Sequence, residues 1–228
     1  MTFSPPSGLI PPMDAALQLS SISAHMDRIS PAPSVSAIAL EARDPFRILI
    51  STLISLRTRD EVTLTVSRRL FAFADTADVL AEADPEEIAR LIYPCGFYTV
   101  KAQRIRNISR IIRDEHGGTV PASFSGLLAL PGVGRKTAAL TLALGFQIPA
   151  VCVDIHVHRI SNRLGWVSTR TPEETEFALM ELLEQERWSE VNEALVRFGQ
   201  VICTPGRPRC SRCPLSGGCP KIGVSSSR

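Results

Sequence analysis

Apolar residues along this chain recur at intervals of three and four, which is the spacing of one face of an α-helix. No segment alternates apolar and polar residues in the way a half-exposed strand would. The helical pattern is found from about Met13, over Pro45–Ser55 and Asp60–Phe73, from Pro85, and over residues 100–115, 125–130, 135–144, 155–164, 172–183 and 190–201. The sequence therefore predicts an all-α fold.

Local signals predict where some elements begin and end. Residues 1–12 are rich in Ser, Pro and Gly, which predicts a loose tail. Asp84 precedes Pro85 and two glutamates, an arrangement typical of a helix N-cap followed by an acidic first turn. The chain has 228 residues, of which 44% are hydrophobic and only 6% aromatic. This length and composition suit cores built from aliphatic side chains on helices.

The net charge is only +2, but the charges are unevenly distributed. Residues 97–140 carry 7 basic and 2 acidic side chains, and residues 203–228 carry 5 basic and no acidic ones. Two basic blocks in a nearly neutral chain fit a surface that contacts a polyanion. Ordinary scatter of surface charge explains them equally well, so charge alone leaves both interpretations open.

The sequence contains no signal for a membrane or for secretion. No apolar run approaches the roughly 18 residues of a membrane span, and the N-terminus lacks a basic start followed by an apolar signal segment. We therefore expect an intracellular protein with no membrane partner, in the cytoplasm or nucleoid if the source is bacterial. Cysteines in that compartment usually stay reduced or bind metal.

Four of the six cysteines form a compact motif near the C-terminus. They are spaced Cys203-x6-Cys210-x2-Cys213-x5-Cys219, so that four thiolates fall within 17 residues. Thiolates are the ligands that zinc and iron–sulfur clusters prefer, whereas two disulfides are the competing arrangement. Structural zinc sites mostly use two tight pairs, and the single tight pair here favours a cluster without excluding zinc. For Cys95 and Cys152 we expect small, buried, apolar roles.

A glycine-rich turn separates two of the predicted helices. Pro131 stops the first helix, Gly132 and Gly134 permit a tight turn around Val133, and the second helix starts near Arg135. The backbone N–H groups at such a helix start can receive a phosphate, as in a helix-hairpin-helix element. A plain pair of helices joined by a glycine turn is the alternative.

Lys136 lies in the first turn of that second helix. The helix dipole and Arg135 both oppose a cation there, which favours the neutral, nucleophilic amine. A lysine that only binds phosphate is the alternative, and the local sequence does not separate the two roles. Asp154 opens another predicted helix, where its carboxylate would cap the helix and could also act as a base or electrostatic partner. His156 and His158 are either phosphate contacts or surface residues.

Together these motifs resemble the endonuclease III family of helix-hairpin-helix DNA glycosylases over roughly residues 30–222. The resemblance rests on residues 130–138, on residues 153–156 and on the four-cysteine spacing. It implies a two-lobed fold, with a six-helix barrel over residues 38–148. Residues 1–37 and 149–228 would form a discontinuous second lobe, in which Cys203, Cys210, Cys213 and Cys219 hold a [4Fe–4S] cluster.

The resemblance also implies a function. The chain would be a monomeric base-excision-repair enzyme acting on double-stranded DNA that contains damaged bases or abasic sites. It would remove oxidised pyrimidines and cleave the abasic site by β-elimination through a Schiff base, with Lys136 as the catalytic amine and Asp154 as its acidic partner. The implied DNA contacts are Gly132, Val133, Gly134, Arg135, His156, Arg207 and Arg209.

Two positions depart from the family pattern. Arg57 stands where a glutamine is common in a DNA-inserting loop, and Phe97 stands where a leucine wedge is common. We hypothesise that Arg57 fills the space left by a flipped base and that Phe97 stacks in the duplex. Other interpretations remain open: a monofunctional or mismatch-specific glycosylase on the same fold, a non-catalytic DNA-binding module, or a scaffold protein with a zinc ribbon.

Overall fold

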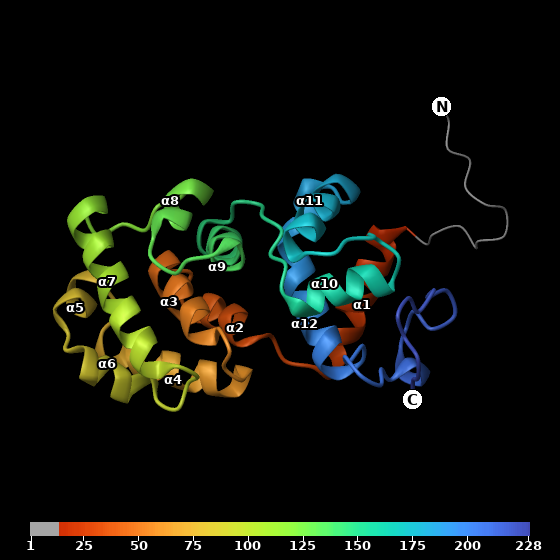
Figure 1. Cartoon of the computed structure of the whole chain (residues 1–228), viewed down its shortest axis with the longest axis horizontal. Helices are drawn as coiled ribbons and strands as arrows, with labels where there is room; N and C mark the ends of the chain where they lie inside the picture. Colours follow the sequence, from red (N-terminus) through yellow and green to blue (C-terminus); the bar gives the residue numbers. More distant parts are fainter. Residues whose placement is uncertain (1–13) are drawn as a thin grey trace. The chain divides into compact units, whose positions relative to one another are not determined.

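The structure, a computed structural model, describes residues 14–228. The tail predicted over residues 1–12 lies outside the described residues. The described chain is helical and contains no strand, which confirms the all-α prediction. It divides into two compact units (Figure 1). Ala32–Cys152 form one, and the described residues up to Pro31 form the other together with Val153–Arg228. The boundaries at residues 38 and 148, with the functions expected of the two lobes, stay a prediction.

Helix α3 (Pro45–Ser55) lies at the centre of the unit Ala32–Cys152. It is buried on nearly all sides, including Ser51 and Thr52, and the Thr52 hydroxyl donates to the backbone oxygen of Ile48 over 2.7 Å. An all-round apolar helix of this kind belongs in a core. The surrounding helices are α2 (Ser34–Glu41), α4 (Asp60–Phe73), α5 (Ala77–Glu82), α6 (Pro85–Ile92), α7 (Tyr98–His116), α8 (Phe124–Ala129) and α9 (Arg135–Leu140).

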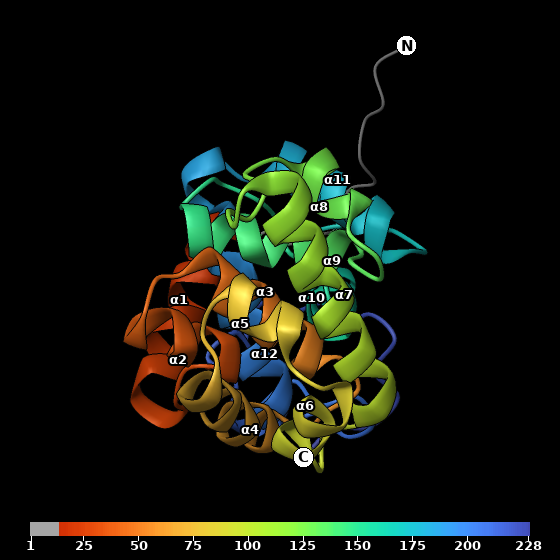
Figure 2. The ribbon, with the colours of Figure 1, turned by 90° about the vertical axis from the view of Figure 1, so that its left-hand side faces the viewer.

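Helix α7 packs against α5 and α6 (Figure 2). Ile105, Ile108 and Ile112 are fully buried. Asp84 caps α6 as predicted, since its carboxylate accepts from the Glu86 amide over 2.9 Å. Helices α2 and α5, of 8 and 6 residues, were not predicted from the sequence. Beyond α9 the chain continues as a π-helical turn.

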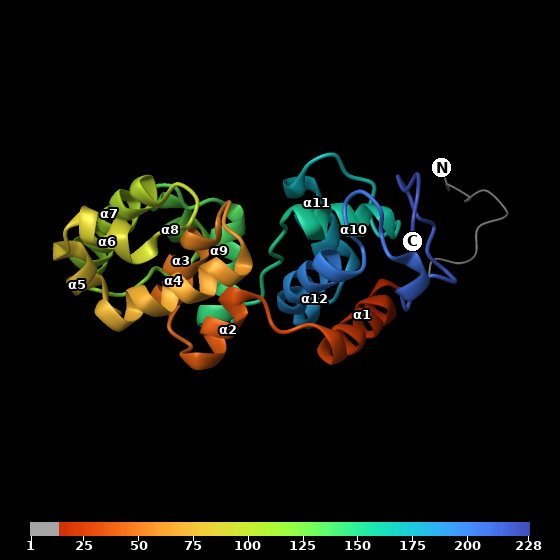
Figure 3. The ribbon, with the colours of Figure 1, turned by 90° about the horizontal axis from the view of Figure 1, so that it is seen from below.

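The second unit joins the N-terminal helix α1 (Ala15–Ile29) to the C-terminal segment. Its other helices are α10 (Ile155–Arg163), α11 (Pro172–Leu182) and α12 (Trp188–Val201), and α12 contacts both α1 and α10 (Figure 3). The buried Arg197 of α12 donates to the backbone oxygens of Met26 and Ser30 and to the Asp27 carboxylate. One side chain of α12 thus binds the carbonyls at the C-terminal end of α1 and holds the two helices together.

Candidate functional site

The glycine turn between α8 and α9 has the geometry that its sequence predicts. Gly132 adopts a left-handed φ of 77°, and the Val133 amide donates to the Leu130 oxygen over 3.1 Å. Val133 is buried and anchors the turn, whereas a Cβ added at Gly134 would meet nothing within 4 Å. Gly134 is the N-cap of α9 and provides no capping side chain. The backbone at the start of α9 is therefore open to close approach by a ligand.

The side chain of Arg104 lies directly on this turn. A Cβ added at Gly132 would sit 2.3 Å from Arg104 Nε, so a larger residue would displace this side chain, and the left-handed φ of Gly132 itself favours glycine. The Arg104 guanidinium makes no hydrogen bond or ion pair with any residue in the part of the chain that the structure describes. In the sequence Arg104 is one of seven basic residues between positions 97 and 140, and nothing local distinguishes it from the others.

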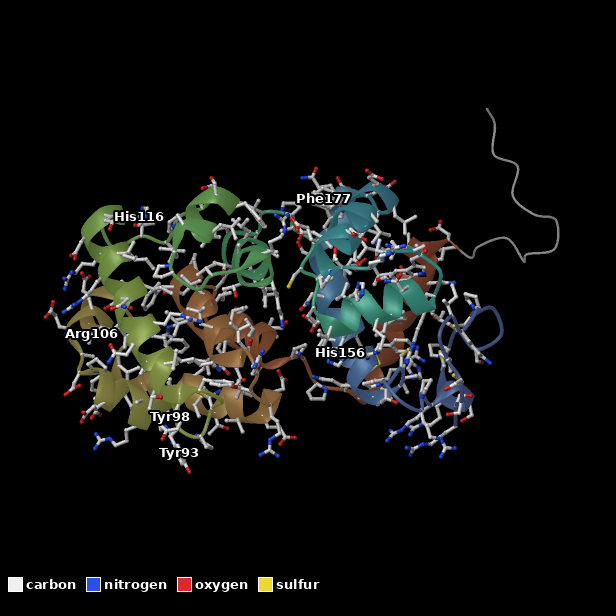
Figure 4. All side chains as sticks on the ribbon, viewed as in Figure 1. Tyr93, Tyr98, Arg106, His116, His156 and Phe177 are labelled. Carbon is white, nitrogen blue, oxygen red and sulfur yellow. The ribbon has the colours of Figure 1, made fainter. Side chains whose placement is uncertain are left out.

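The other arginines of α7 are bound within the unit. Arg106, labelled in Figure 4, and Arg110 each direct Nε to the Ala81 oxygen at the end of α5, over 3.4 and 3.2 Å. Arg113 pairs with Glu82 and with Asp114. The basic block over residues 97–140 therefore contains two kinds of arginine. Some stabilise the fold, whereas the charge of Arg104 faces no described partner.

Lys136 lies half-buried in the first turn of α9. Its backbone oxygen accepts from the Cys152 thiol over 3.5 Å, which ties the helix start to the end of the unit. The neighbouring Arg135 stacks its guanidinium over the Phe124 ring, 4.7 Å from the ring centroid. Cys152 and Cys95 are both buried, in keeping with the apolar roles expected of them.

Asp154 is the N-cap of α10, as its sequence position predicts. Its Oδ1 accepts from the amides of His156 and Val157 over 2.8 and 2.9 Å, and the residue is half-buried. Asp154 belongs to the unit that contains Val153–Arg228, whereas Lys136 belongs to Ala32–Cys152. The capping role is thus confirmed, and the catalytic role stays a prediction.

His156 projects from the first turn of α10 (Figure 4) and packs closely against α12. A Cβ added at Gly199 of α12 would sit 2.4 Å from His156 Nδ1, so this crossing requires a glycine. Nδ1 also lies 3.2 Å from Nη2 of Arg159, which itself donates to the Cys203 oxygen over 2.9 Å. Burial lowers the pKa of Arg159, with Arg163 nearby adding to the effect. His158 instead places its Nδ1 2.7 Å from the Thr175 hydroxyl, a contact within its own unit.

The four C-terminal cysteines line one pocket. Its apolar wall includes Leu164, Phe198 and Ile202. None of these four cysteines forms a disulfide among residues 14–228, so the two-disulfide arrangement is not the one adopted. Among residues 14–228, no three His, Cys, Asp or Glu side chains already meet at a single-ion site. Burial raises the pKa of the Cys213 thiol to about 11 and also raises that of Cys219, so metal binding at these sulfurs would release protons.

Arg163 braces the segment that carries the first cysteine. It is buried, and its guanidinium donates to the backbone oxygens of Thr204 and Pro205 and, over 3.6 Å, to Cys203 Sγ. Of the two arginines predicted to contact DNA in this loop, Arg207 is exposed and Arg209 half-buried. These contacts of Arg163 could not be predicted from local patterns, because the acceptors lie about forty residues further along the chain.

Comparison with known proteins identifies the family. Residues 50–185 match the HhH-GPD superfamily of base excision DNA repair proteins. Endonuclease III of Thermotoga maritima is 54% identical over 176 residues, which cover 77% of this chain and 83% of that protein. The chain belongs to the endonuclease III family. It is thus an enzyme of base excision DNA repair.

Other relatives and solved structures agree with this membership. A chloroplastic endonuclease III homologue of Arabidopsis thaliana is 45% identical over 77% of this chain, although the chain spans only 48% of that protein. A trapped covalent intermediate of an endonuclease III with DNA is 30% identical with a TM-score of 0.81, covering 93% of this chain and 97% of that one. A thermostable thymine-DNA glycosylase is 25% identical with a TM-score of 0.79, covering 90% of this chain and 95% of that one.

No helix among residues 14–228 is long and apolar enough to cross a membrane.

Proposed function

We propose that this enzyme removes oxidised pyrimidines from duplex DNA and cleaves the resulting abasic site by β-elimination. The observation that carries the proposal is the location of Lys136 in the first turn after the glycine turn. The chain has only three lysines. Lys101 is buried with its Nζ donating to three oxygens, and Lys221 is exposed beyond the last cysteine. Lys136 is therefore the side-chain amine best suited to act as the nucleophile.

The proposed reaction uses an amine and a carboxylate of the protein, and water to hydrolyse the final Schiff base and release the amine. Asp154 accepts a proton from the amine or stabilises the positive charge that develops on the sugar. Nζ of Lys136 attacks C1′ while the N-glycosidic bond breaks, and the base leaves with the bonding electrons and a proton. Opening of the sugar ring gives a protonated Schiff base, which acidifies the C2′ proton. Loss of that proton breaks the C3′–O bond and expels the 3′ phosphate.

The proposed partner is double-stranded DNA with damaged bases or abasic sites, bound by a monomer inside the cell. The solved neighbour in covalent complex with DNA supports this partner. Backbone groups of Gly132, Val133 and Gly134 would hold a phosphate without reading sequence, and Arg104 would add a positive charge beside them. The further proposed contacts are Arg135, His156, Arg207 and Arg209, with Arg57 and Phe97 entering the duplex.

We further propose that Cys203, Cys210, Cys213 and Cys219 hold a [4Fe–4S] cluster. Their common pocket and their family support this assignment. A cubane cluster binds each thiolate through a different iron atom, so the four sulfurs need not converge on one point as they would around zinc. When bound, the cluster would cross-link the loop after α12. Arg163 would hold the Cys203 segment in position for it.

Borohydride trapping on duplex DNA that carries an oxidised pyrimidine tests the catalytic role of Lys136. Borohydride reduces a Schiff base to a stable amine and leaves a covalent protein–DNA band. We expect the band with the wild type and with Lys221→Ala, the matched control for a lost surface lysine. Lys136→Ala should give none while remaining folded.

Other outcomes of the trapping experiment point elsewhere. A band that persists in Lys136→Ala would contradict the assignment of the nucleophile. Base release without a band or strand cleavage would favour a monofunctional or mismatch-specific glycosylase, the second candidate. The likeness to a thymine-DNA glycosylase is what supports this candidate, and a G·T mismatch substrate tests it directly. Binding without any release would indicate a non-catalytic DNA-binding module.

A further inference from the structure

Two loops of the unit Ala32–Cys152 place their tip residues side by side. Arg57, just after α3, has φ 54°, and Phe97, just before α7, has φ 58°. Left-handed backbone costs free energy for any residue with a Cβ and persists only where its surroundings enforce it. The Arg57 guanidinium lies over the Phe97 ring, 5.6 Å from the ring centroid. Phe97 is 60% exposed, so the pair stands at the surface.

The backbones of the two loops are in direct contact. A Cβ added at Gly96 would sit 2.4 Å from the backbone oxygen of Arg57, so any larger residue at position 96 would push the loops apart. The Gly96 amide donates to the Thr58 hydroxyl oxygen over 3.1 Å. The residue before Phe97 is therefore tied to the residue after Arg57.

Lys101 fastens this junction from inside the unit. It is 5% exposed, and its Nζ donates to the backbone oxygens of Ile54 and Leu56, each over 2.6 Å, and to the Thr58 hydroxyl oxygen over 2.9 Å. All three ammonium protons are used, and none goes to a carboxylate. Burial lowers the pKa of Lys101. Because one hydroxyl, that of Thr58, accepts from both Lys101 and Gly96, the two loops share a single polar junction.

We propose that Lys101 is a positioning residue that holds Arg57 and Phe97 in one fixed arrangement. The two side chains then enter the DNA duplex as a unit, which we call the composite probe. The inference rests on the proposed function, in which both side chains enter the duplex at the extruded base. Lys101 touches neither DNA nor the reacting atoms. It fixes the two left-handed tips, so that the cation and the ring enter the duplex together rather than as independent side chains. The contributions of Arg57 and Phe97 to base removal are therefore coupled, and both depend on Lys101.

Single-turnover base removal measures this coupling. Lys101→Met keeps roughly the length of the side chain but removes the three hydrogen bonds that Nζ donates. The variant is made in the wild-type background and in the Arg57→Ala/Phe97→Ala background, and it is assayed against each of the four opposite bases. We expect Lys101→Met to lower the wild-type rate by about tenfold to a hundredfold and to flatten the opposite-base preference, because a displaced positioning group costs rate on that scale. In the doubly substituted background the loss should fall below about twofold.

Arg106→Met is the matched control, because Arg106 lies on the same helix and donates to a backbone oxygen away from these loops. It should leave the rate and the opposite-base preference unchanged. Thr58→Val repeats the test with Lys101 and its two backbone acceptors retained, since it removes only the shared hydroxyl. It should give a smaller loss with the same dependence on Arg57 and Phe97, and it carries the test if Lys101→Met does not fold.

An equal loss from Lys101→Met or Thr58→Val in both backgrounds would reduce Lys101 to a fold-stabilising residue and overturn the proposal. Additive effects of Arg57→Ala and Phe97→Ala would do the same. Each of these results leaves base removal by the wild type intact, so the proposed function would stand. A wild type that removes no base from any lesion would instead defeat the proposed function, and the composite probe with it.

Discussion

At the scale of single residues, Asp154 combines a structural role with a proposed chemical one. Its carboxylate caps α10 by accepting from two backbone amides. A carboxylate at this place also carries the negative charge that the proposed mechanism needs beside the reacting sugar. The two roles can be separated by substitution, because asparagine caps helices about as well as aspartate but carries no charge.

We expect Asp154→Asn to keep the stability of the wild type and to lose activity. The rate of base removal should fall by about a hundredfold or more, the lower end of what a proton-transfer or charge-stabilising group contributes. Asp154→Ala should lose the same activity and also about 1 kcal/mol of unfolding free energy, since the cap is gone. Thermal unfolding and single-turnover assays on both variants give the comparison. A wild-type rate in Asp154→Asn would show that the charge is not required.

At the scale of elements, helix α7 divides its arginines between two tasks. Arg106 and Arg110 donate to the last turn of α5 and so stabilise the packing of the two helices. Arg104 lies on the glycine turn. Because they share one helix, substitutions at Arg104 and Arg106 remove the same charge from the same element and differ only in what the side chain contacts.

We expect Arg104→Gln to weaken binding to damaged and undamaged duplex alike. The slope of log K against log salt concentration should become shallower by about 1, as for the loss of one phosphate contact. Arg106→Gln should leave the slope unchanged and lower the melting temperature instead. Fluorescence anisotropy over a salt series measures both. Equal slopes for the two variants would remove Arg104 from the DNA contacts.

At the scale of the whole molecule, the unit with the cysteines is assembled from both ends of the described chain. Arg197 binds the end of α1, and Arg163 holds the loop that begins the cysteine motif. The segment after Val201 contains only a short 3-10 turn, Cys210–Arg212, and otherwise lacks regular structure. Such a loop buries little apolar surface of its own, so a metal centre would supply much of its stability.

We expect Cys210→Ser to abolish the visible absorbance of the purified protein. The melting temperature should fall by about 5 °C or more, which corresponds to a loss of roughly 2 kcal/mol in the free energy of unfolding for a chain of this size. Cys152→Ala, which removes a buried cysteine outside the motif, should keep the absorbance. A colourless wild type that contains zinc would contradict the cluster assignment. An unchanged melting temperature after loss of the metal would contradict its structural role.

Several features were determined by the sequence alone, because they depend on residues only a few positions apart. The apolar periods of α3, α4 and α7, the caps at Asp84 and Asp154, and the turn at Gly132 are all local. The family could likewise be predicted from short motifs, since the hairpin and the cysteine spacing each occupy fewer than twenty residues.

Which residues these elements bring together became known only from the packing of the helices. Lys101 meets acceptors more than forty residues away, and Arg104 lies on a turn 28 positions further along the chain. The sequence could not distinguish Arg106 and Arg110 from Arg104. All three are arginines on one helix, and the pattern along that helix does not show what each side chain contacts. Contacts of this kind depend on how helices pack, and the pattern along a single helix does not specify them.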